Sequence, residues 1–502
     1  MKTQLKHLLT MALVALAAWS TARGGSFDAA YRDLPFAMPE VQRPSIPDFT
    51  ILLPDQGGVA DGRTINTEAF ARAMQTLKEH GGGRLVVPAG IWLTGPIELE
   101  SHVELHLERG ALILFTDDRT QYPLIDGNFE GLNTKRCQSP LSAHDKQDIA
   151  VTGPGAINGN GQAWRPVKRG KLTAGQWKEL TEGGGATNAK GDVWYVSDRV
   201  REVSENPDAM RRAYNSGTSE AWDYVHDFLR PVMVSLVNCK NVLLEDATFE
   251  NSPAWNLHPL GCENVIIHNV TVRNPWYAQN GDGLDLESCR NVLVIDSSFD
   301  VGDDAICIKS GKDKQGRDRG MPCENVVVEG CVVYHGHGGF VIGSEMSGGA
   351  RNIMVRNCLF SGTDVGLRFK STRGRGGVVE KIWCDRIYMN NIAGDAIIFD
   401  LYYGIKPGAP VPPVSEKTPE FRDFHITNIV CQQSKCPLRM TGLPELPVSE
   451  IHFADCLLHG RTAAQLDHVR NTTLDRVRIE VEEAGEPIRT GNVQGLAVTP
   501  QP

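Results

Sequence analysis

One short pattern recurs along this chain and restricts its fold more than any other feature. Each copy spans four residues: a variable residue, a polar or charged residue, Asn or a substitute for it, and an aliphatic residue. A run of β-branched residues follows most copies. The clearest copies begin at Cys239, Cys262, Cys289 and Cys323, which lie 23, 27 and 34 residues apart. Short strands at such intervals predict a solenoid whose stacked coils bury one continuous core. Weaker copies begin at Ala350, Val379, Phe421, Val448 and Val469.

A β-sandwich and a β-propeller are the alternatives to this solenoid. Sandwich strands follow one another more closely, and propeller blades need a longer and more regular period. The sequence therefore favours an all-β, single-stranded parallel β-helix. Apolar residues at Phe70, Met74 and Leu77 predict an amphipathic helix that ends near Gly81 and caps the N-terminal end of the solenoid. Residues 161–230 break the pattern and are interpreted as one long insertion.

The first residues have the features of an export signal. Lys2 and Lys6 precede an apolar run over residues 8–19, and small residues follow at 20–22. We expect a signal peptide at 1–22, a single catalytic domain at 23–502, and an exported protein that acts in the periplasm or outside the cell. The apolar run is too short for a membrane span. A net charge of −10 argues against a nucleic-acid partner, and we expect a monomer.

The chain has twelve cysteines, a number that suggests disulfides in an exported protein. Most of them, however, lie inside or just before the repeated apolar runs. Because a buried free cysteine behaves as a small apolar residue, we interpret most of them as unpaired. Cys431 and Cys436, in a polar stretch, are the best candidates for a disulfide.

A second register lies about half a coil from the first. The segments 282–288, 304–310, 338–344 and 365–371 align, with their final serines 22, 34 and 27 residues apart. Apolar residues alternate in each segment and are expected to face the core, because successive side chains of a strand point to opposite sides. The residues between them are therefore expected on the outer face: Asp285, Glu287, Lys309, Arg368 and Lys370.

The same alignment brings acids together at the strand entrances. It sets Asp282 level with Asp304, and Asp303 level with His337, on rungs about 4.8 Å apart. Each residue alone is commonest in a turn, and His335 with His337 is too small a set to predict a metal site. Their joint occurrence in register predicts a catalytic patch.

The chemistry of this patch fits glycoside hydrolysis. That reaction needs one protonated carboxyl group to donate to the leaving oxygen and another carboxylate to activate water. Crowding three aspartates raises the pKa of one of them by like-charge repulsion. Arg368 and Lys370 offer cations to a sugar that carries a carboxylate, so the pattern favours a uronic-acid substrate.

These segments resemble the four motifs of the polygalacturonase family, glycoside hydrolase family 28. They read Asn280-Gly-Asp, Gly302-Asp-Asp, Gly336-His-Gly and Arg368-Phe-Lys in the order of the family, and the likeness covers most of the chain from about residue 60. Gly281 stands where the family has Thr, and Phe369 where it has Ile. Neither departure removes a catalytic group.

The resemblance implies a right-handed β-helix and an inverting hydrolase without metal or cofactor. It implies that Asp303 is the general acid and that Asp282 and Asp304 activate water, with acid and base carboxyls roughly 6.5–9.5 Å apart. His337 would tune the protonation of the acid. The resemblance also suggests substrate-binding roles for Arg368, Lys370, Asn280, Lys309 and Tyr403, with Tyr402 as the less favoured tyrosine.

Two further segments look like those of bacterial exo-acting members. They are Asn251–Pro259 and Ile342–Glu345, whose Trp255, His258 and Glu345 are candidates for binding the terminal sugar of a pectic chain. A simple coil corner is an equally good interpretation of both segments. Exo action needs a groove closed at one end, and the insertion at 161–230 is long enough to close it.

Other functions remain open from the sequence. An endo-polygalacturonase and a rhamnogalacturonan hydrolase would use the same residues. A lyase of this fold would bind calcium through the three aspartates and use Lys370 as a base. A β-helix adhesin or phage tail protein would carry the acids without catalysis.

Overall fold

The computed structural model describes residues 27–406 and 408–499. The chain divides into two compact units, Met1–Glu40 and Val41–Pro502. In the described part of the first unit, a short 3₁₀ helix spans Asp28–Tyr31. The predicted signal peptide lies outside the described residues, so it stays a prediction. Among the residues that the structure describes, no helix is both long and apolar enough to cross a membrane.

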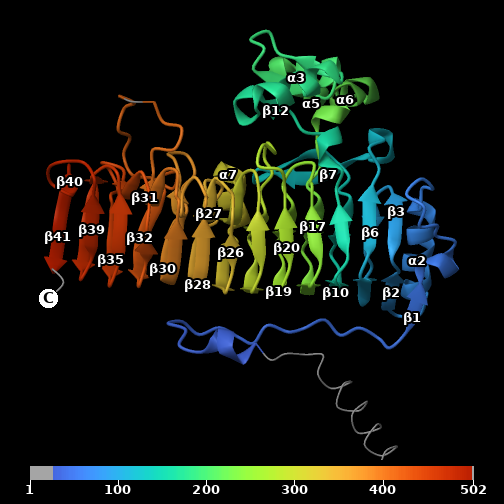
Figure 1. Ribbon diagram of the computed structural model, residues 1–502, viewed down its shortest axis with the longest axis horizontal. Coiled ribbons are helices and arrows are strands. Elements are labelled where there is room, and N and C mark those ends of the chain that lie inside the picture. The colour runs from blue at the N-terminus through green and yellow to red at the C-terminus, as the bar shows by residue number, and fades with distance from the viewer. Residues whose placement is uncertain (1–26, 407, 500–502) are drawn as a thin grey trace, which may run out of the picture. The chain divides into compact units, whose positions relative to one another are not determined.

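The second unit is a right-handed parallel β-helix, as predicted, with strands stacked along one axis (Figure 1). Its parallel strands form one sheet of 24 strands and one of 12 strands. The smaller sheet, here called the site sheet, is formed by β4 (Ile97–Glu98), β9 (Leu141–His144), β15 (Val234–Val237), β18 (Leu257–Leu260), β21 (Leu284–Glu287), β24 (Asp304–Lys309), β27 (Gly338–Ile342), β29 (Leu367–Lys370), β31 (Asp395–Asp400), β34 (Cys436–Thr441), β37 (Ala464–Asp467) and β40 (Ile488–Thr490).

The larger sheet covers the rest of the coil and contains the repeated pattern. Its strands are β1 (Thr50–Leu52), β2 (Gly83–Val87), β3 (Gly90–Thr94), β5 (Val103–Leu107), β6 (Ala111–Phe115), β10 (Gln147–Thr152), β11 (Ala156–Asn158), β16 (Lys240–Glu245), β17 (Thr248–Glu250), β19 (Glu263–His268), β20 (Thr271–Arg273), β22 (Arg290–Ile295), β23 (Ser298–Asp300), β25 (Cys323–Glu329), β26 (Val332–Val333), β28 (Ala350–Ser361), β30 (Val378–Asn390), β32 (Glu420–Thr427), β33 (Val430–Cys431), β35 (Val448–Ala454), β36 (Leu457–Gly460), β38 (Val469–Asp475), β39 (Arg478–Val481) and β41 (Val493–Thr499).

The predicted alternation within the site sheet is confirmed. Leu284 pairs with Ile306, Ile306 with Phe340, and Phe340 with Leu367, and all four side chains are fully buried. Stacked apolar side chains of this kind form the continuous core that no single coil could bury alone. The pairing also fixes which outward-facing residues of successive coils become neighbours.

The repeated asparagine has a structural role at a corner of the coil. Asn264, Asn291, Asn325 and Asn352 all have a positive φ, between 55° and 58°, a conformation that Asn tolerates better than most residues. Each side-chain amide donates to the asparagine of the preceding coil, at distances of 3.0 to 3.4 Å. This ladder explains why the repeat places Asn immediately before the aliphatic residue.

A capping helix and a helical insertion accompany the solenoid. The predicted cap is α2 (Thr67–Glu79), whose buried face includes Phe70, Met74 and Leu77. The insertion at 161–230 contains a small sheet and several helices, with a cluster around Trp164, Val203 and Val225 as its own core. Its elements are β12 (Val167–Lys168), β13 (Ala186–Thr187), β14 (Val193–Tyr195), α3 (Ala174–Glu182), α4 (Asp198–Glu205), α5 (Asp208–Ser216) and α6 (Ser219–Val225).

An antiparallel hairpin, which the sequence analysis did not predict, stands over the site sheet. It consists of β7 (Leu124–Phe129) and β8 (Leu132–Cys137). The two residues of its turn, Glu130 and Gly131, both have a positive φ, as a tight hairpin turn requires. The Gly131 carbonyl accepts a hydrogen bond of 3.0 Å from the amide of Lys312. Gln315 of α7 (Asp313–Arg319) accepts one of 2.8 Å from Asn133, so the tip is anchored on a distant loop.

Within residues 27–406 and 408–499, all twelve cysteines are buried and unpaired. The interpretation of most of them as small apolar residues is confirmed. The proposed disulfide between Cys431 and Cys436 is wrong, because both thiols are free. Their sulfurs instead donate to backbone carbonyls, Cys431 to Gln433 and Cys436 to Leu438 and Ala463.

Candidate active site

The register of the site sheet gathers most of the candidate residues around one cavity. Asp304 pairs with Gly338, which places Asp303 level with His337 as predicted. The cavity has a volume of about 410 Å³. Its lining residues are Glu130, Trp255, Gln279, Asn280, Asp282, Asp303, Asp304, Lys309, Lys312, His337, Ser344, Glu345, Arg368, Lys370, Arg375 and Tyr403.

Three aspartates form the centre of this cavity. Asp282, Asp303 and Asp304 each present a carboxylate oxygen, and these oxygens lie within 4.8 Å of one another. Asp282 and Asp304 are almost fully buried, whereas the side chain of Asp303 is 17% exposed. Asp303 is thus the carboxyl group of the three that a bound molecule reaches most easily.

Two cations hold Asp304 in its charged form. Lys370 Nζ lies 2.7 Å from one carboxylate oxygen, and an Arg368 guanidinium nitrogen lies 3.2 Å from the other. Although burial opposes the effect, these two charges hold the pKa of Asp304 well below its usual range. Asp304 therefore acts as a permanent anion and as a hydrogen-bond acceptor.

Asp282 has the opposite electrostatic environment. Its Oδ1 is buried without a hydrogen-bond partner among the described residues. Burial, followed by the charges of Asp303 and Asp285, raises the pKa of Asp282 well above its usual range. The rise in one pKa that crowding of the acids predicts is thus found at Asp282.

His337 connects the aspartate cluster to the insertion. Its Nδ1 lies 3.0 Å from Asp303 Oδ1, and its Nε2 lies 3.3 Å from Lys171 Nζ and 3.9 Å from Asp364. The hydrogen bond to Asp303 raises the pKa of His337, while burial and the charge of Lys171 oppose that rise. One imidazole nitrogen therefore has both an ammonium and a carboxylate within reach.

A second group of charges lies beside the aspartates. Lys309 Nζ lies 3.0 Å from Glu345 and 3.5 Å from Asp285, and 4.7 Å from the centre of the Trp255 ring. Although burial opposes the effect, Lys309 and then Lys370 lower the pKa of Glu345 to about 2. Glu345 is therefore an anion that accepts hydrogen bonds.

Tyr403 and Asn280 complete the predicted binding residues that line the cavity. The Lys370 ammonium and the Arg368 guanidinium lie 5.2 and 5.9 Å from the centre of the Tyr403 ring. The Asn280 side-chain oxygen accepts a hydrogen bond of 2.9 Å from Arg230. The less favoured tyrosine, Tyr402, instead packs beside Arg373.

The structure places three predicted residues differently. His258 lies outside the lining of this cavity and contacts Glu287, with 2.9 Å between His258 Nε2 and the carboxylate. Glu287 and Asp285 keep the outward register that was expected, but neighbouring side chains cover both of them fully. Glu287 is covered because Arg319 of α7 closes over it at 2.6 Å, and sequence spacing does not show such a covering loop.

Sequence reasoning missed three charged residues of the cavity: Glu130, Lys312 and Arg375. Lys312 and Arg375 follow closely after strands β24 and β29, a position that could have identified them. Glu130 comes from the hairpin, whose antiparallel pairing lies outside the repeat. Its Glu130-Gly131 turn is the one local signal that could have indicated a hairpin there.

Carboxylate spacing departs from the expected acid–base separation of 6.5–9.5 Å, because the nearest oxygens lie within 4.8 Å. The cause is that Asp303 and Asp304 are consecutive and Asp282 lies one rung away. This spacing would also suit a cation, but Lys370 and Arg368 already neutralise Asp304 and would repel it.

Comparison with known proteins assigns the chain to a family. The model of glycosyl hydrolases family 28 matches residues 215–474. An exo-poly-α-D-galacturonosidase of Dickeya chrysanthemi is 27% identical over 460 residues, covering 88% of this chain and 73% of the relative. An endo-polygalacturonase of Pectobacterium carotovorum subsp. carotovorum is 26% identical over 365 residues, covering 72% of this chain and 78% of the relative.

A solved structure gives the same result. An exopolygalacturonase from Thermotoga maritima is 32% identical, has a TM-score of 0.71, and covers 91% of this chain and 94% of its own. The family match spans the aspartates, His337, Arg368 and Lys370 together. This chain belongs to glycosyl hydrolases family 28 and is a glycoside hydrolase.

Proposed function

We propose that this protein hydrolyses α-1,4-galacturonosyl linkages of pectin from the chain end and releases galacturonic acid. The observation that carries the proposal is the cluster of three carboxyl groups within 4.8 Å, flanked on one side by Arg368 and Lys370. Five carboxyl groups and five cations line the cavity. Two of these cations, Arg368 and Lys370, lie beside the aspartates and favour a sugar that carries a carboxylate.

We assign the catalytic roles by position and exposure. Asp303, the most exposed of the three, donates the proton to the leaving oxygen. Asp282 and Asp304 activate the water, and the permanent charge on Asp304 suits a base. His337 contacts Asp303 and adjusts the proton that this carboxyl group carries.

The binding roles follow from the groups that remain free to contact a sugar. Arg368 uses one nitrogen on Asp304, which leaves other N–H donors for a substrate carboxylate. Lys370 binds the same substrate carboxylate, and the Tyr403 ring packs against the sugar ring. Trp255, Lys309, Glu345 and Asn280 would bind the sugar on the hairpin side.

Exo action is supported by the hairpin and by the insertion. Glu130 at the hairpin tip lines the cavity, and Phe129 stacks on Trp255 with 5.1 Å between ring centres. Lys171 of the insertion reaches His337. A polymer running along the site sheet would meet the hairpin beside the aspartates, so only a chain end fits. The named activities of the Dickeya and Thermotoga relatives agree with this proposal.

Product analysis on a defined galacturonate pentamer tests this proposal. We expect monomer and tetramer as the first products, without ultraviolet-absorbing unsaturated ends. Dimer and trimer appearing first would establish endo action, and unsaturated ends would establish a lyase. Proton NMR of the first product should show the β-anomer, because family resemblance implies inversion; the α-anomer would indicate retention. Failure to cleave the pentamer, with cleavage of a rhamnose-containing backbone, would favour the rhamnogalacturonan alternative.

A further inference from the structure

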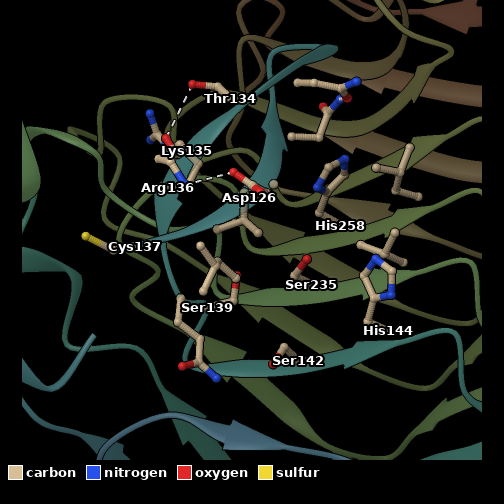
Figure 2. Close-up of a pocket in the computed structure, with 18 of the residues that line it drawn as sticks. Asp126, Thr134, Lys135, Arg136, Cys137, Ser139, Ser142, His144, Ser235 and His258 are labelled. Atoms are coloured by element: carbon tan, nitrogen blue, oxygen red, sulfur yellow. Dashed lines mark hydrogen bonds and ion pairs between the residues drawn. The ribbon is translucent and has the colours of Figure 1, made fainter. Parts of the chain in front are cut away.

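A second cavity, of about 760 Å³, is lined by the hairpin, the insertion and the site sheet (Figure 2). Its floor continues the outer face of the site sheet. Ser142 pairs with Ser235, and Ser235 pairs with His258. Pairing of β18 with β21 then places His258 level with Asp285, beside the aspartate cluster. This strip of the sheet therefore runs from the second cavity toward the aspartate cluster. The hairpin lines both cavities, with Glu130 in the first and residues 125–128 and 133–137 in the second.

The walls of this second cavity come from the hairpin and the insertion. Arg136 and Lys135 of β8 line it together with Tyr214 of α5 and Trp222 of α6. The Tyr214 and Trp222 rings meet edge to face, 4.9 Å apart, and the Tyr214 hydroxyl lies 2.5 Å from Thr134 of the hairpin. A polar floor with aromatic walls is the composition of sites that bind sugars, whose rings have one polar and one apolar side.

One cation of this cavity has no ion-pair partner among the described residues, although the carboxylates of Glu98 and Asp126 also line the cavity. Lys135 is paired with Asp126 at 3.0 Å, but Arg136 has no carboxylate partner among the described residues and donates to the carbonyl of Arg230. Burial, and then the charge of Arg230, lower the pKa of Arg136 to about 9. A partly buried guanidinium in such surroundings is stabilised when an anion joins it.

His258 adds a polar group that points at the same space. It is 1% exposed and lines the cavity, and its Nε2 is held by Glu287 at 2.9 Å. In the same cavity, the buried Nε of Arg136 has no hydrogen-bond partner among the described residues. A buried polar atom that is left unpaired costs free energy, which a ligand hydroxyl or carboxylate would recover.

We propose that this second cavity binds a carboxylate-bearing sugar, with Arg136 as the partner of the carboxylate, Ser235 and His258 as hydrogen-bonding groups on the floor, and Trp222 as the wall against which the ring packs. The ligand lies across the hairpin from the aspartate cluster and is not hydrolysed there. The cavity would hold a pectic chain or a released uronate while the first cavity acts on a chain end. The choice of a galacturonide as ligand rests on the proposed function.

Binding to an Asp303→Asn parent, which retains both cavities, tests the proposal. Isothermal titration with digalacturonate should give two molecules bound per chain. Adding Ser235→Phe, which fills the floor of the second cavity, should leave one. Adding Arg136→Gln should weaken one of the two sites by about tenfold or more, since a hydrogen-bonded charge is lost. Galactobiose, which has the same rings without carboxylates, should not bind the second cavity.

The matched control is Lys314→Gln, which removes a charge from the exposed α7 pair with Asp318 and should leave both sites intact. One molecule bound by the parent, or two bound by the Ser235→Phe variant, would overturn the proposal. Equal binding of galactobiose would overturn the carboxylate recognition. Hydrolysis of the pentamer by the unaltered protein is measured separately, so a failed second site is distinguished from a wrong proposed function.

Discussion

At the scale of single residues, three neighbouring carboxyl groups differ because their surroundings differ. Asp304 has two cations at hydrogen-bonding distance, whereas Asp282 is buried beside other acids. Such divergence of pKa values among adjacent acids is a common property of catalytic sites. His337 then couples the exposed carboxyl, Asp303, to a lysine from a segment far from it in sequence.

Lys171 is predicted to lower the pKa of His337, because an ammonium 3.3 Å from Nε2 disfavours the imidazolium. The other charged groups near this ring are Asp303, Asp304 and Asp364. Replacing Lys171 by Ala should raise the pKa of His337, as followed by NMR titration of the imidazole protons. The part of the pH–activity profile that is set by the titration of His337 should therefore move to higher pH in this variant.

Lys168→Ala is the matched control, since Lys168 belongs to the same insertion and is exposed at the end of β12, whereas Lys171 contacts His337. A Lys171→Ala profile that coincides with that of the control, or that moves to lower pH, would rule out the coupling.

The sequence predicted the members of the aspartate cluster but not their protonation. Aligning the strand segments with alternating apolar residues was enough to place Asp282, Asp303 and His337 together. In a solenoid, residues at equivalent positions of successive repeats pair with one another. Which acid holds a proton depends on burial and on contacts with Lys370 and Arg368, which spacing does not define. His258 was misplaced for a similar reason: it belongs to the correct strip, but on the far side of a hairpin that the repeat does not contain.

At the scale of secondary-structure elements, we propose that the β7–β8 hairpin limits how much of the site sheet a substrate can use. It contributes Glu130 to the first cavity and Arg136 to the second, and its tip is held by Lys312 and Gln315. From the sequence, the insertion at 161–230 was expected to be long enough to close the groove for exo action. The structure adds the hairpin, which lies before that insertion in the chain.

Truncation of the hairpin is expected to open the groove. Residues 128–133 would be replaced by two glycines. The first products released from the pentamer should then shift from monomer and tetramer to dimer and trimer, because a polymer could extend along the site sheet past Trp255. Glu130→Gln keeps the hairpin and should still release monomer first. Chromatographic sizing at early time points measures both variants, and monomer as the first product of the truncated variant would exclude the hairpin as the barrier.

At the scale of the whole molecule, stacking of coils makes neighbours of residues that are distant in sequence. The core runs through successive coils as one cluster, and nine of the twelve buried cysteines belong to it as small apolar side chains. The fold class was predictable because each coil repeats the same pattern. The helical insertion was recognisable as an interruption, but its helices share one apolar cluster with Tyr122 and Cys137, which the repeat does not encode.

Stability is expected not to depend on redox conditions. All twelve thiols should titrate with a thiol reagent in denaturant without prior reduction, since no disulfide joins them in the described residues. The unfolding temperature should be the same with and without dithiothreitol. Fewer than twelve reactive thiols, or a lower unfolding temperature in reductant, would contradict this account of the core.

The central claim is that side chains from separate coils act as one hydrolytic centre, and the activity of an Asp303→Asn variant tests it most directly. The measurement is kcat/KM on the galacturonate pentamer, beside Asp318→Asn as a control for an exposed acid on α7. Loss of a general acid should lower kcat/KM by about 10²–10⁴-fold, with unchanged circular dichroism and unchanged activity in the control. An Asp303→Asn variant as active as the Asp318→Asn control would contradict the claim.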